Sequence, residues 1–227
     1  MDLIVLDTET TGLEVGEGHR VIEVGCVRLR QRKHTDHKFH SYLNPGRGID
    51  PGAQEVHGIS SEFLSDKPVF AEIADSFLEF IKGNELVIHN ASFDIGFLNR
   101  ELEILGLDQK IEDICRVTDS LRLAREMHPG QRNSLDALCR RYSVDNTGRE
   151  LHGALLDAEI LSDVYLAMTG GQTLLSLDDH REVANKAGTA STKYKNRKDT
   201  FPIVRASADE NEAHQKWIDL LGNKSLW

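Results

Sequence analysis

The 227-residue sequence contains few cysteines, and their positions are unsuited to cross-linking. Cys26, Cys115 and Cys139 are an odd number, lie far apart and include no CxxC pair. This spacing argues against a disulfide framework and against a structural zinc site. We therefore expect the three residues to be small, buried and apolar in character.

Long hydrophobic runs are also missing. No segment approaches the roughly 20 apolar residues needed to cross a bilayer. The run Leu3–Leu6 is too short for a signal peptide and is followed by Asp7. We expect a cytoplasmic protein with no membrane partner, and the hydrophobic content of 39% is enough for a packed core.

A positive net charge, which proteins that bind DNA without sequence preference usually show on one face, is absent too. The formal net charge is -10 at pH 7. Residues 171–227 hold nine Lys and Arg and eight Asp and Glu, which leaves 18 basic and 29 acidic residues, or -11, for residues 1–170. Bound cations can invert the field of an acidic site. We therefore expect weak DNA binding by the chain alone, and a partner that delivers the substrate.

The sequence does contain carboxylates and a histidine in informative places. Asp7 and Glu9 follow an apolar run, Asp94 lies where a predicted strand gives way to a helix, and His152 and Asp157 lie where a loop enters another helix. Carboxylates with one histidine and no cysteine cluster suit hard divalent cations. If the five side chains converge, they indicate metal-assisted attack on a phosphodiester.

Local spacing is compatible with convergence, although each residue also has a simpler interpretation. Asp7 and Glu9 are two apart on a predicted strand, so they share a face, but Asp7 could also be a polar strand end. Asp94, in the first turn of its helix, could have the simpler role of stabilising the helix dipole. His152 ahead of its helix and Asp157 one turn inside it can face one cavity, with His152 as general base; the alternative is a surface histidine.

Hydrophobic periodicity predicts an α/β domain with a mixed sheet, in which an antiparallel meander precedes strands that alternate with helices. The expected strands are Leu3–Asp7, Val21–Leu29, Lys38–Leu43, Leu86–His89 and Ile111–Cys115. The expected helices are Ala71–Ile81, Ser92–Leu105, Val117–Glu126, Ser134–Tyr142 and Ala154–Met168. Glycine and proline make Asn44–Gly52 a predicted loop.

The sequence changes character after residue 170. Asp178–Thr200 is polar and aperiodic, so we expect a domain over residues 1–170, a flexible linker over 171–206 and a separate segment over 207–227. Ser207 and Glu210 form a candidate capping box. The helix that follows carries Trp217 but has no core of its own, so it should dock on another protein.

Five sequence blocks together resemble the DEDDh superfamily of 3′→5′ exonucleases. They are DTETTG, VHGIS with KPVF, LVIHNASFDIGFLN, NSLDALC and HGALLDAE, and they span nearly all of residues 1–170. Within this superfamily the similarity is greatest to the epsilon-type proofreading subunits of bacterial DNA polymerase III. The resemblance implies a ribonuclease H-like fold and two divalent metal ions, Mg²⁺ or Mn²⁺.

The resemblance also implies roles for individual residues. The implied metal ligands are Asp7, Glu9, Asp94 and Asp157. The implied substrate contacts are Asp7, Glu9, His57 and Asp157. His152 would be the general base, while His57 on residue pattern alone fits packing as well as substrate contact. Where the family has a further acidic substrate contact, this sequence has Gly52.

The tail resembles two docking segments of the same family. The stretch from Gln172 to Leu177 is similar to the QxxLxL/F peptide that binds the sliding clamp, with Gln172, Leu175 and Leu177 at the matching positions. The helix with Trp217, Leu220 and Leu221 resembles the segment that attaches to the polymerase alpha (catalytic) subunit. The resemblance leaves a small theta-like accessory subunit open as a partner.

The predicted function is proofreading: removal of mismatched nucleotides from a single-stranded 3′ end of DNA, together with tethering of polymerase to clamp. Two alternatives stay open. One is a stand-alone exonuclease that trims RNA or DNA, which would have no need of docking peptides. The other is a non-catalytic tether between polymerase and clamp, which the presence of all five site residues disfavours.

Overall fold

The computed structural model describes residues 2–148, 151–170 and 206–221. The chain divides into two compact units, Met1–Leu175 and Ser176–Trp227. Within the described ranges, no helix is long and apolar enough to span a membrane. The predicted clamp peptide (Gln172, Leu175 and Leu177) and nearly all of the predicted linker lie outside these ranges.

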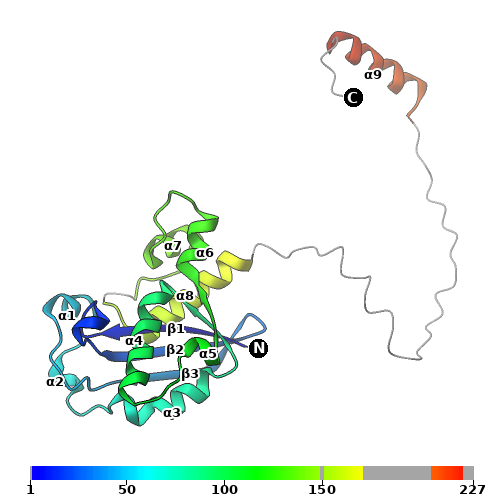
Figure 1. Cartoon of the computed structure of the whole chain (residues 1–227). Helices are drawn as coiled ribbons and strands as arrows, with labels where there is room; N and C mark the ends of the chain where they lie inside the picture. The colour runs from blue at the N-terminus through cyan, green and yellow to red at the C-terminus, as the bar shows by residue number, and fades with distance from the viewer. Residues whose placement is uncertain (1, 149–150, 171–205, 222–227) are drawn as a thin grey trace, which may run out of the picture. The chain divides into compact units, whose positions relative to one another are not determined.

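A five-stranded mixed sheet forms the centre of the first unit (Figure 1). Its strands are β1 (Leu3–Thr10), β2 (Val21–Arg30), β3 (Lys33–Tyr42), β4 (Glu85–Ile88) and β5 (Arg116–Asp119). They lie in the order β3-β2-β1-β4-β5. β1, β2 and β3 pair antiparallel, whereas β4 pairs parallel with both β1 and β5. The predicted meander and mixed sheet are confirmed.

Helices cover both faces of this sheet. In the described part of the first unit they are α1 (Pro51–His57), α2 (Ser61–Leu64), α3 (Phe70–Ile81), α4 (Ala91–Ile104), α5 (Ile111–Ile114), α6 (Ser120–Met127), α7 (Leu135–Tyr142) and α8 (Ala154–Gly170), with a 3-10 turn, η1 (Val15–Glu17), after β1. The hydrophobic core on one face joins the sheet to α3 and α4, and the core on the other joins it to α6, α7 and α8.

The continuous apolar run of strand β1 is explained by the burial of both of its faces. Ile4 and Leu6 belong to the core on the α3 and α4 face, while Val5 between them belongs to the core on the α8 face. All three are fully buried. A strand covered on both faces needs apolar residues at every position, which is why the run predicted a central strand.

The region around residue 115 was predicted wrongly. Ile111–Cys115 is not a strand: it contains the short helix α5, and the fifth strand follows at Arg116–Asp119. The Asn99 side chain holds the first turn of α5, because its Oδ1 atom accepts a hydrogen bond from Ile111 N (2.9 Å). The helix predicted over Val117–Glu126 therefore begins later, at α6, where the Asp119 carboxylate caps the first turn.

Two other local features escaped sequence analysis. The predicted loop Asn44–Gly52 already contains the start of α1, where Pro51 occupies the first turn. Strand β3 begins at Lys33, five residues before the predicted start, because Gln31 and Arg32 make a tight turn with positive φ angles of 50° and 61°. Neither residue is glycine or asparagine, which are the usual signals for such a turn.

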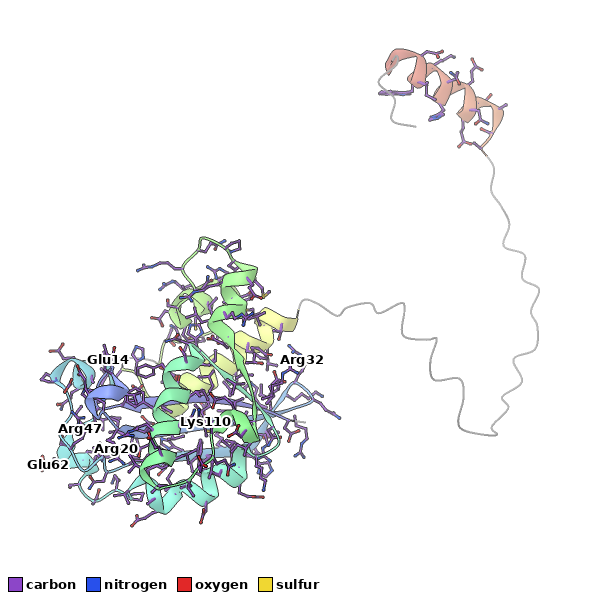
Figure 2. The ribbon with its side chains drawn as sticks, viewed as in Figure 1. Glu14, Arg20, Arg32, Arg47, Glu62 and Lys110 are labelled. Carbon is purple, nitrogen blue, oxygen red and sulfur yellow. The ribbon has the colours of Figure 1, made fainter. Side chains whose placement is uncertain are left out.

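The three cysteines are free thiols, and all are buried, as predicted. Helix α4 is tied to the start of β2 by a partly buried ion pair: Arg20 Nη2 donates to Glu101 Oε2 at 2.6 Å. Glu101 is also an acceptor for Val21 N (3.1 Å). Arg20 is labelled in Figure 2, which shows the side chains of the described residues. Because Glu101 is deeply buried, its partners compensate for its loss of water.

Helix α9 (Ala208–Leu221) is described in the second unit. The predicted capping box is present, with Ser207 N donating to Glu210 Oε2 (2.8 Å) and Glu210 N donating to Ser207 Oγ (3.2 Å). Trp217 is 66% exposed, as expected for a helix without its own core. The side chains of Leu220 and Leu221 lie outside the described part.

The approach of α8 to the sheet depends on a glycine of β2. A Cβ atom added to Gly25 would lie 2.3 Å from the backbone nitrogen of Leu155 and 2.4 Å from the carbonyl carbon of Ala154. Backbone atoms cannot rotate away as a side chain can, so a larger residue at position 25 must displace the start of α8. Gly25 is also the direct partner of Asp7 in the β1–β2 ladder.

We predict that Gly25→Ala lowers the free energy of unfolding by roughly 1–3 kcal/mol through this overlap. Urea denaturation of the purified variants measures the effect. Gly48→Ala is the matched control, since a Cβ there meets no atom within 4 Å, and it should change stability by less than about 0.5 kcal/mol. Equal stabilities for the two variants would contradict a close α8–β2 contact.

Candidate active site

The site forms where β1 extends beyond its parallel neighbour. The β1–β4 pairing ends at Val5 and Val87, whereas the residues of β1 from Asp7 to Thr10 pair with β2. Beyond β4 the chain turns through Asn90, whose φ is 68°, into α4. Ends of parallel strands are where open α/β sheets form their binding crevices, and this divergence leaves space beside the end of β1.

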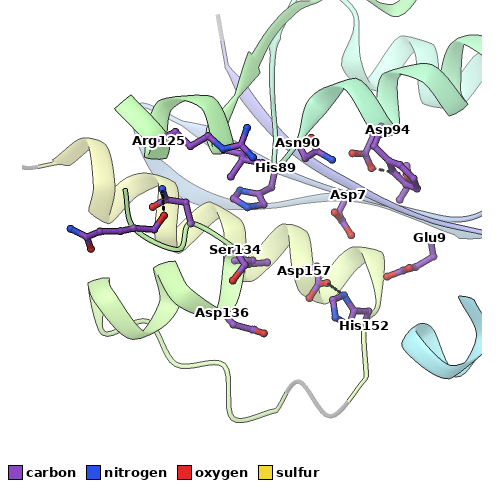
Figure 3. Close-up of a pocket in the computed structure, with 16 residues that line it drawn as sticks. Asp7, Glu9, His89, Asn90, Asp94, Arg125, Ser134, Asp136, His152 and Asp157 are labelled. Carbon is purple, nitrogen blue, oxygen red and sulfur yellow. Dashed lines mark hydrogen bonds and ion pairs between the residues drawn. The ribbon is translucent and has the colours of Figure 1, made fainter. Parts of the chain in front are cut away.

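A cavity of about 630 Å³ occupies this space. The five side chains singled out from the sequence all line it, and Figure 3 shows them directed into it. They are Asp7, Glu9, Asp94, His152 and Asp157. The predicted convergence of residues 150 positions apart is therefore present in the structure.

Asp94 comes from α4 and is 97% buried. Its Oδ1 atom accepts a hydrogen bond from Thr8 Oγ1 at 2.7 Å. Burial raises the pKa of Asp94 to about 7, although the Thr8 hydrogen bond acts in the opposite direction. Successive residues of a strand point to opposite faces. β1 therefore directs Asp7 and Glu9 towards α8 and uses Thr8 to hold Asp94 on the other face.

Asp157 and His152 approach from the opposite side of the sheet. Asp157 is buried in the first turn of α8, and its Oδ2 atom lies 3.2 Å from His152 Nδ1. Glu9, His152 and Asp157 each offer a ligand atom within 4.8 Å of the others, a spacing that could hold a metal ion. The His152 backbone N–H donates to Val56 O of α1 (3.1 Å), which anchors the loop ahead of α8.

His57 lies next to this cavity rather than in it. It lines a second cavity of about 590 Å³, which shares Thr8, Glu9 and Phe93 with the first. The His57 ring is buried, and its Nδ1 accepts from Ile59 N (2.9 Å). Burial lowers the pKa of His57, which favours the neutral ring.

Gly52 lies in the first turn of α1 and lines the same second cavity. A Cβ atom added to it would meet no atom within 4 Å. The position therefore has room for the acidic side chain that the resemblance associates with it. Position 52 itself supplies no carboxylate, although Asp50 lines the same cavity.

Sequence reasoning missed several residues of the larger cavity. Its remaining lining includes His89, Asn90, Arg125, Asn133, Ser134 and Asp136. His89 Nδ1 lies 3.0 Å from Ser120 Oγ, which fixes the ring at the end of β4. Residues 133–136 belong to the block NSLDALC. This block contributes to the family resemblance, but the resemblance assigns no function to its individual residues. No periodicity signal marks Arg125, because it looks like any polar residue on an amphipathic helix.

Comparison with known proteins identifies the family. Residues 4–165 match the Exonuclease (RNase_T) family. Over 233 residues the sequence is 53% identical to DNA polymerase III subunit epsilon of Salmonella typhimurium, covering 99% of this chain and 96% of that protein. This chain belongs to the exonuclease family of polymerase III epsilon subunits. The epsilon subunit of Escherichia coli strain K12 is 52% identical over the same coverage.

Solved structures confirm the fold. Exonuclease X, solved in complex with 5′-overhanging duplex DNA, is 25% identical and superposes with a TM-score of 0.59, covering 74% of this chain and 92% of that chain. The nuclease domain of 3'hExo, described as a DEDDh family member, gives a TM-score of 0.65 at 15% identity, covering 75% of this chain and 92% of that chain. The epsilon-family chain thus has the ribonuclease H-like exonuclease fold that was predicted.

We predict that Asp94→Asn stabilises the metal-free protein above neutral pH. In the unfolded chain an aspartate ionises near pH 3.8, whereas folded Asp94 keeps its proton up to about 7. Between pH 3.8 and about 7 the unfolded state therefore binds fewer protons than the folded state. As the pH rises through this window, ionisation of Asp94 lowers the free energy of unfolding of the wild type. The variant lacks this loss.

Urea midpoints in EDTA, measured from pH 4 to pH 8, test this expectation. The difference between variant and wild type should grow with pH and become constant above about pH 8. Asp75→Asn, which removes an exposed carboxylate of α3, controls for the change in net charge. A difference independent of pH would show that Asp94 ionises normally in the folded protein.

Proposed function

We propose that this exonuclease removes 3′-terminal nucleotides from DNA as the proofreading subunit of a bacterial replicative polymerase. The observation that carries the proposal is that one cavity gathers His152 and the four carboxylates of Asp7, Glu9, Asp94 and Asp157, beside a fifth from Asp136. The full-length similarity to polymerase III epsilon subunits supports the assignment to replication. A replication subunit of this kind would act in the bacterial cytoplasm.

The donor set in the cavity fits two divalent cations, Mg²⁺ or Mn²⁺. The proposed ligands are Asp7, Glu9, Asp94 and Asp157. All of them offer carboxylate oxygens, which hard cations prefer, and no cysteine lines the cavity. When bound, such cations supply Lewis-acid stabilisation of the scissile phosphate and of the leaving 3′ oxygen. They also offset the mutual repulsion of four carboxylates gathered in one place.

His152 is proposed to accept the proton of the attacking water. Its side chain is 45% exposed and lies on a loop, so it can reach both solvent and the cavity. The neighbouring Asp157 carboxylate, 3.2 Å from Nδ1, orients the ring and stabilises the imidazolium that forms. Catalysis by proton transfer of this kind contributes about 10²–10⁴ to a rate.

The second cavity would receive the terminal nucleotide. It shares Glu9 with the first cavity and is lined by His57. We propose His57 as a substrate contact together with Asp7, Glu9 and Asp157. A site recessed at a sheet edge suits a single strand better than a duplex. Mismatched ends separate from the template at lower cost, so preference for mismatches would come from fraying without readout of the base.

We predict that His152→Ala lowers the single-turnover rate on a 3′-labelled DNA single strand about 10²–10⁴-fold in Mg²⁺, with little change in DNA affinity. The reason is loss of the proton acceptor while the carboxylates stay in place. Rapid-quench measurement of released nucleotide gives the rate, and binding of the same strand in Ca²⁺ gives the affinity. A rate loss accounted for by weaker binding alone would contradict the base role.

The same assay separates the alternatives. A trimming exonuclease would hydrolyse single-stranded RNA as fast as DNA, whereas a proofreading subunit should prefer DNA. A non-catalytic tether would release no nucleotide from either strand in Mg²⁺ or Mn²⁺. Wild-type protein in EDTA is the control for metal dependence.

The C-terminal part is proposed to connect this exonuclease to its partners. Helix α9 exposes Trp217, a large aromatic residue that is suited to anchoring an interface with the polymerase alpha subunit. Leu220 and Leu221 would belong to the same contact. The segment with Gln172, Leu175 and Leu177 is proposed to bind the sliding clamp, and a theta-like subunit remains a further candidate partner.

We predict that replacing Gln172, Leu175 and Leu177 together by alanine weakens binding to the sliding clamp at least about tenfold, because both leucine anchors are lost. Nuclease activity on free single strands should be unchanged, since these residues follow the exonuclease domain. Surface plasmon resonance with immobilised clamp measures the affinity. Thr173→Ala, at a variable position of the motif, is the control; unchanged clamp affinity in the triple variant would exclude the motif.

A further inference from the structure

Arg125 differs in charge from the rest of the large cavity. It is the one lysine or arginine among the described residues of the lining. Five carboxylates line the same cavity: Asp7, Glu9, Asp94, Asp136 and Asp157. Arg125 lies in the last turn of α6, and its side chain forms no hydrogen bond or ion pair with any described residue. Its guanidinium is therefore available to a ligand.

The wall that carries Arg125 is firmly built. Asn133, in the loop between α6 and α7, is buried, and its Nδ2 donates to the backbone oxygens of His128 (3.3 Å) and Gln131 (3.1 Å). Asn133 Oδ1 accepts from Arg141 Nη1 of α7 (2.9 Å). These bonds fix the loop against both helices. The backbone of this wall is therefore fixed before a ligand binds, and only the exposed Arg125 side chain has to be ordered.

Arg125 is placed to contact the part of a bound strand that lies on the 5′ side of the scissile phosphate. In the view of Figure 3, Arg125 lies on one side of the cavity and Glu9 on the other. The second cavity, which His57 lines, shares Glu9 with the first. If the terminal nucleotide enters that second cavity and the scissile phosphate lies at the carboxylates, Arg125 lies on the side of the cavity away from the terminal nucleotide, where the next part of the strand would pass.

We propose that Arg125 binds a backbone phosphate of the substrate strand on the 5′ side of the scissile bond. This inference rests on the proposed function, because it takes the direction of the strand from it. A guanidinium offers paired donors that match two phosphate oxygens. The contact would offset the repulsion between the acidic cavity and the strand, and it would make longer strands better substrates than a single nucleotide ester.

Two substrates test this proposal. One is a DNA oligonucleotide, and the other is the p-nitrophenyl ester of thymidine 5′-monophosphate, which has a scissile phosphodiester but no nucleotide upstream. Arg125→Ala should lower kcat/KM for the oligonucleotide about tenfold, the effect of losing one charged hydrogen-bonded contact. Hydrolysis of the ester should be unchanged, and Arg125→Lys should restore part of the oligonucleotide activity.

Arg122→Ala is the matched control. Arg122 lies on the same helix, is 81% exposed and pairs with Glu126 outside the cavity. Its removal changes the net charge equally and should leave both substrates unaffected. An arginine near the C-terminal end of a helix can also act by stabilising the helix. If Arg125→Ala lowered ester and oligonucleotide hydrolysis equally, the phosphate contact would be overturned in favour of that structural role.

Neutral linkages locate the contact. One methylphosphonate is placed at the first, second or third linkage upstream of the scissile bond. At one of these positions the neutral linkage should lower the hydrolysis rate of the wild type. At that same position it should not lower the rate of Arg125→Ala any further. Equal losses in both proteins at every position would overturn the proposal.

Failure of the proposed function would be recognised separately, by a wild type that releases nucleotide from neither substrate. Binding of the single strand in EDTA would then still test Arg125. Loss of one phosphate contact should reduce the slope of log affinity against log salt by about 0.7. An unchanged slope would overturn the contact.

Discussion

The contact between Gly25 and the start of α8 is the constraint on which the site depends. It allows the helix backbone to lie directly on the β1–β2 ladder, beside the partner of Asp7. Asp157, one turn further along α8, is thereby brought over the end of β1. Without this approach the carboxylates of β1 and α8 would be separated by at least the thickness of a side chain.

The second half of the site depends on the pleat of β1. Odd-numbered residues at its end face α8, and Thr8 faces α4, where it donates to Asp94. One strand therefore collects acidic groups from both faces of the sheet. Four carboxylates in a shared cavity repel one another, and burial of Asp94 adds a desolvation cost. Activity and stability are opposed here, because the arrangement that suits divalent cations disfavours the metal-free fold.

Elements with strong local signals were predictable. The apolar run of β1, the amphipathic α3 and the capped helix α9 follow from periodicity and capping residues. Errors arose where tertiary contacts replaced local preference. Asn99, from another helix, holds the first turn of α5 with a hydrogen bond, and the turn at Gln31 and Arg32 adopts positive φ angles without glycine. The Asn99 contact joins residues 12 positions apart and adds to a local cap, in which Lys110 N donates to Asp113 Oδ2 (2.9 Å). Gln31 and Arg32 are neighbours, but neither is a residue type that signals positive φ angles.

For this protein the sequence by itself determined four of the five sheet strands, most helices, the exonuclease family and five of the residues that line the cavity. A motif can be found in the sequence because it is defined by residue types and their spacing. Only the tertiary structure decided which cavity His57 lines, that Asp94 is buried and bonded to Thr8, and that Arg125 lines the same cavity as the carboxylates. Those are properties of distance and solvent exclusion, and they exist only after helices from separate parts of the chain have packed on both faces of one sheet.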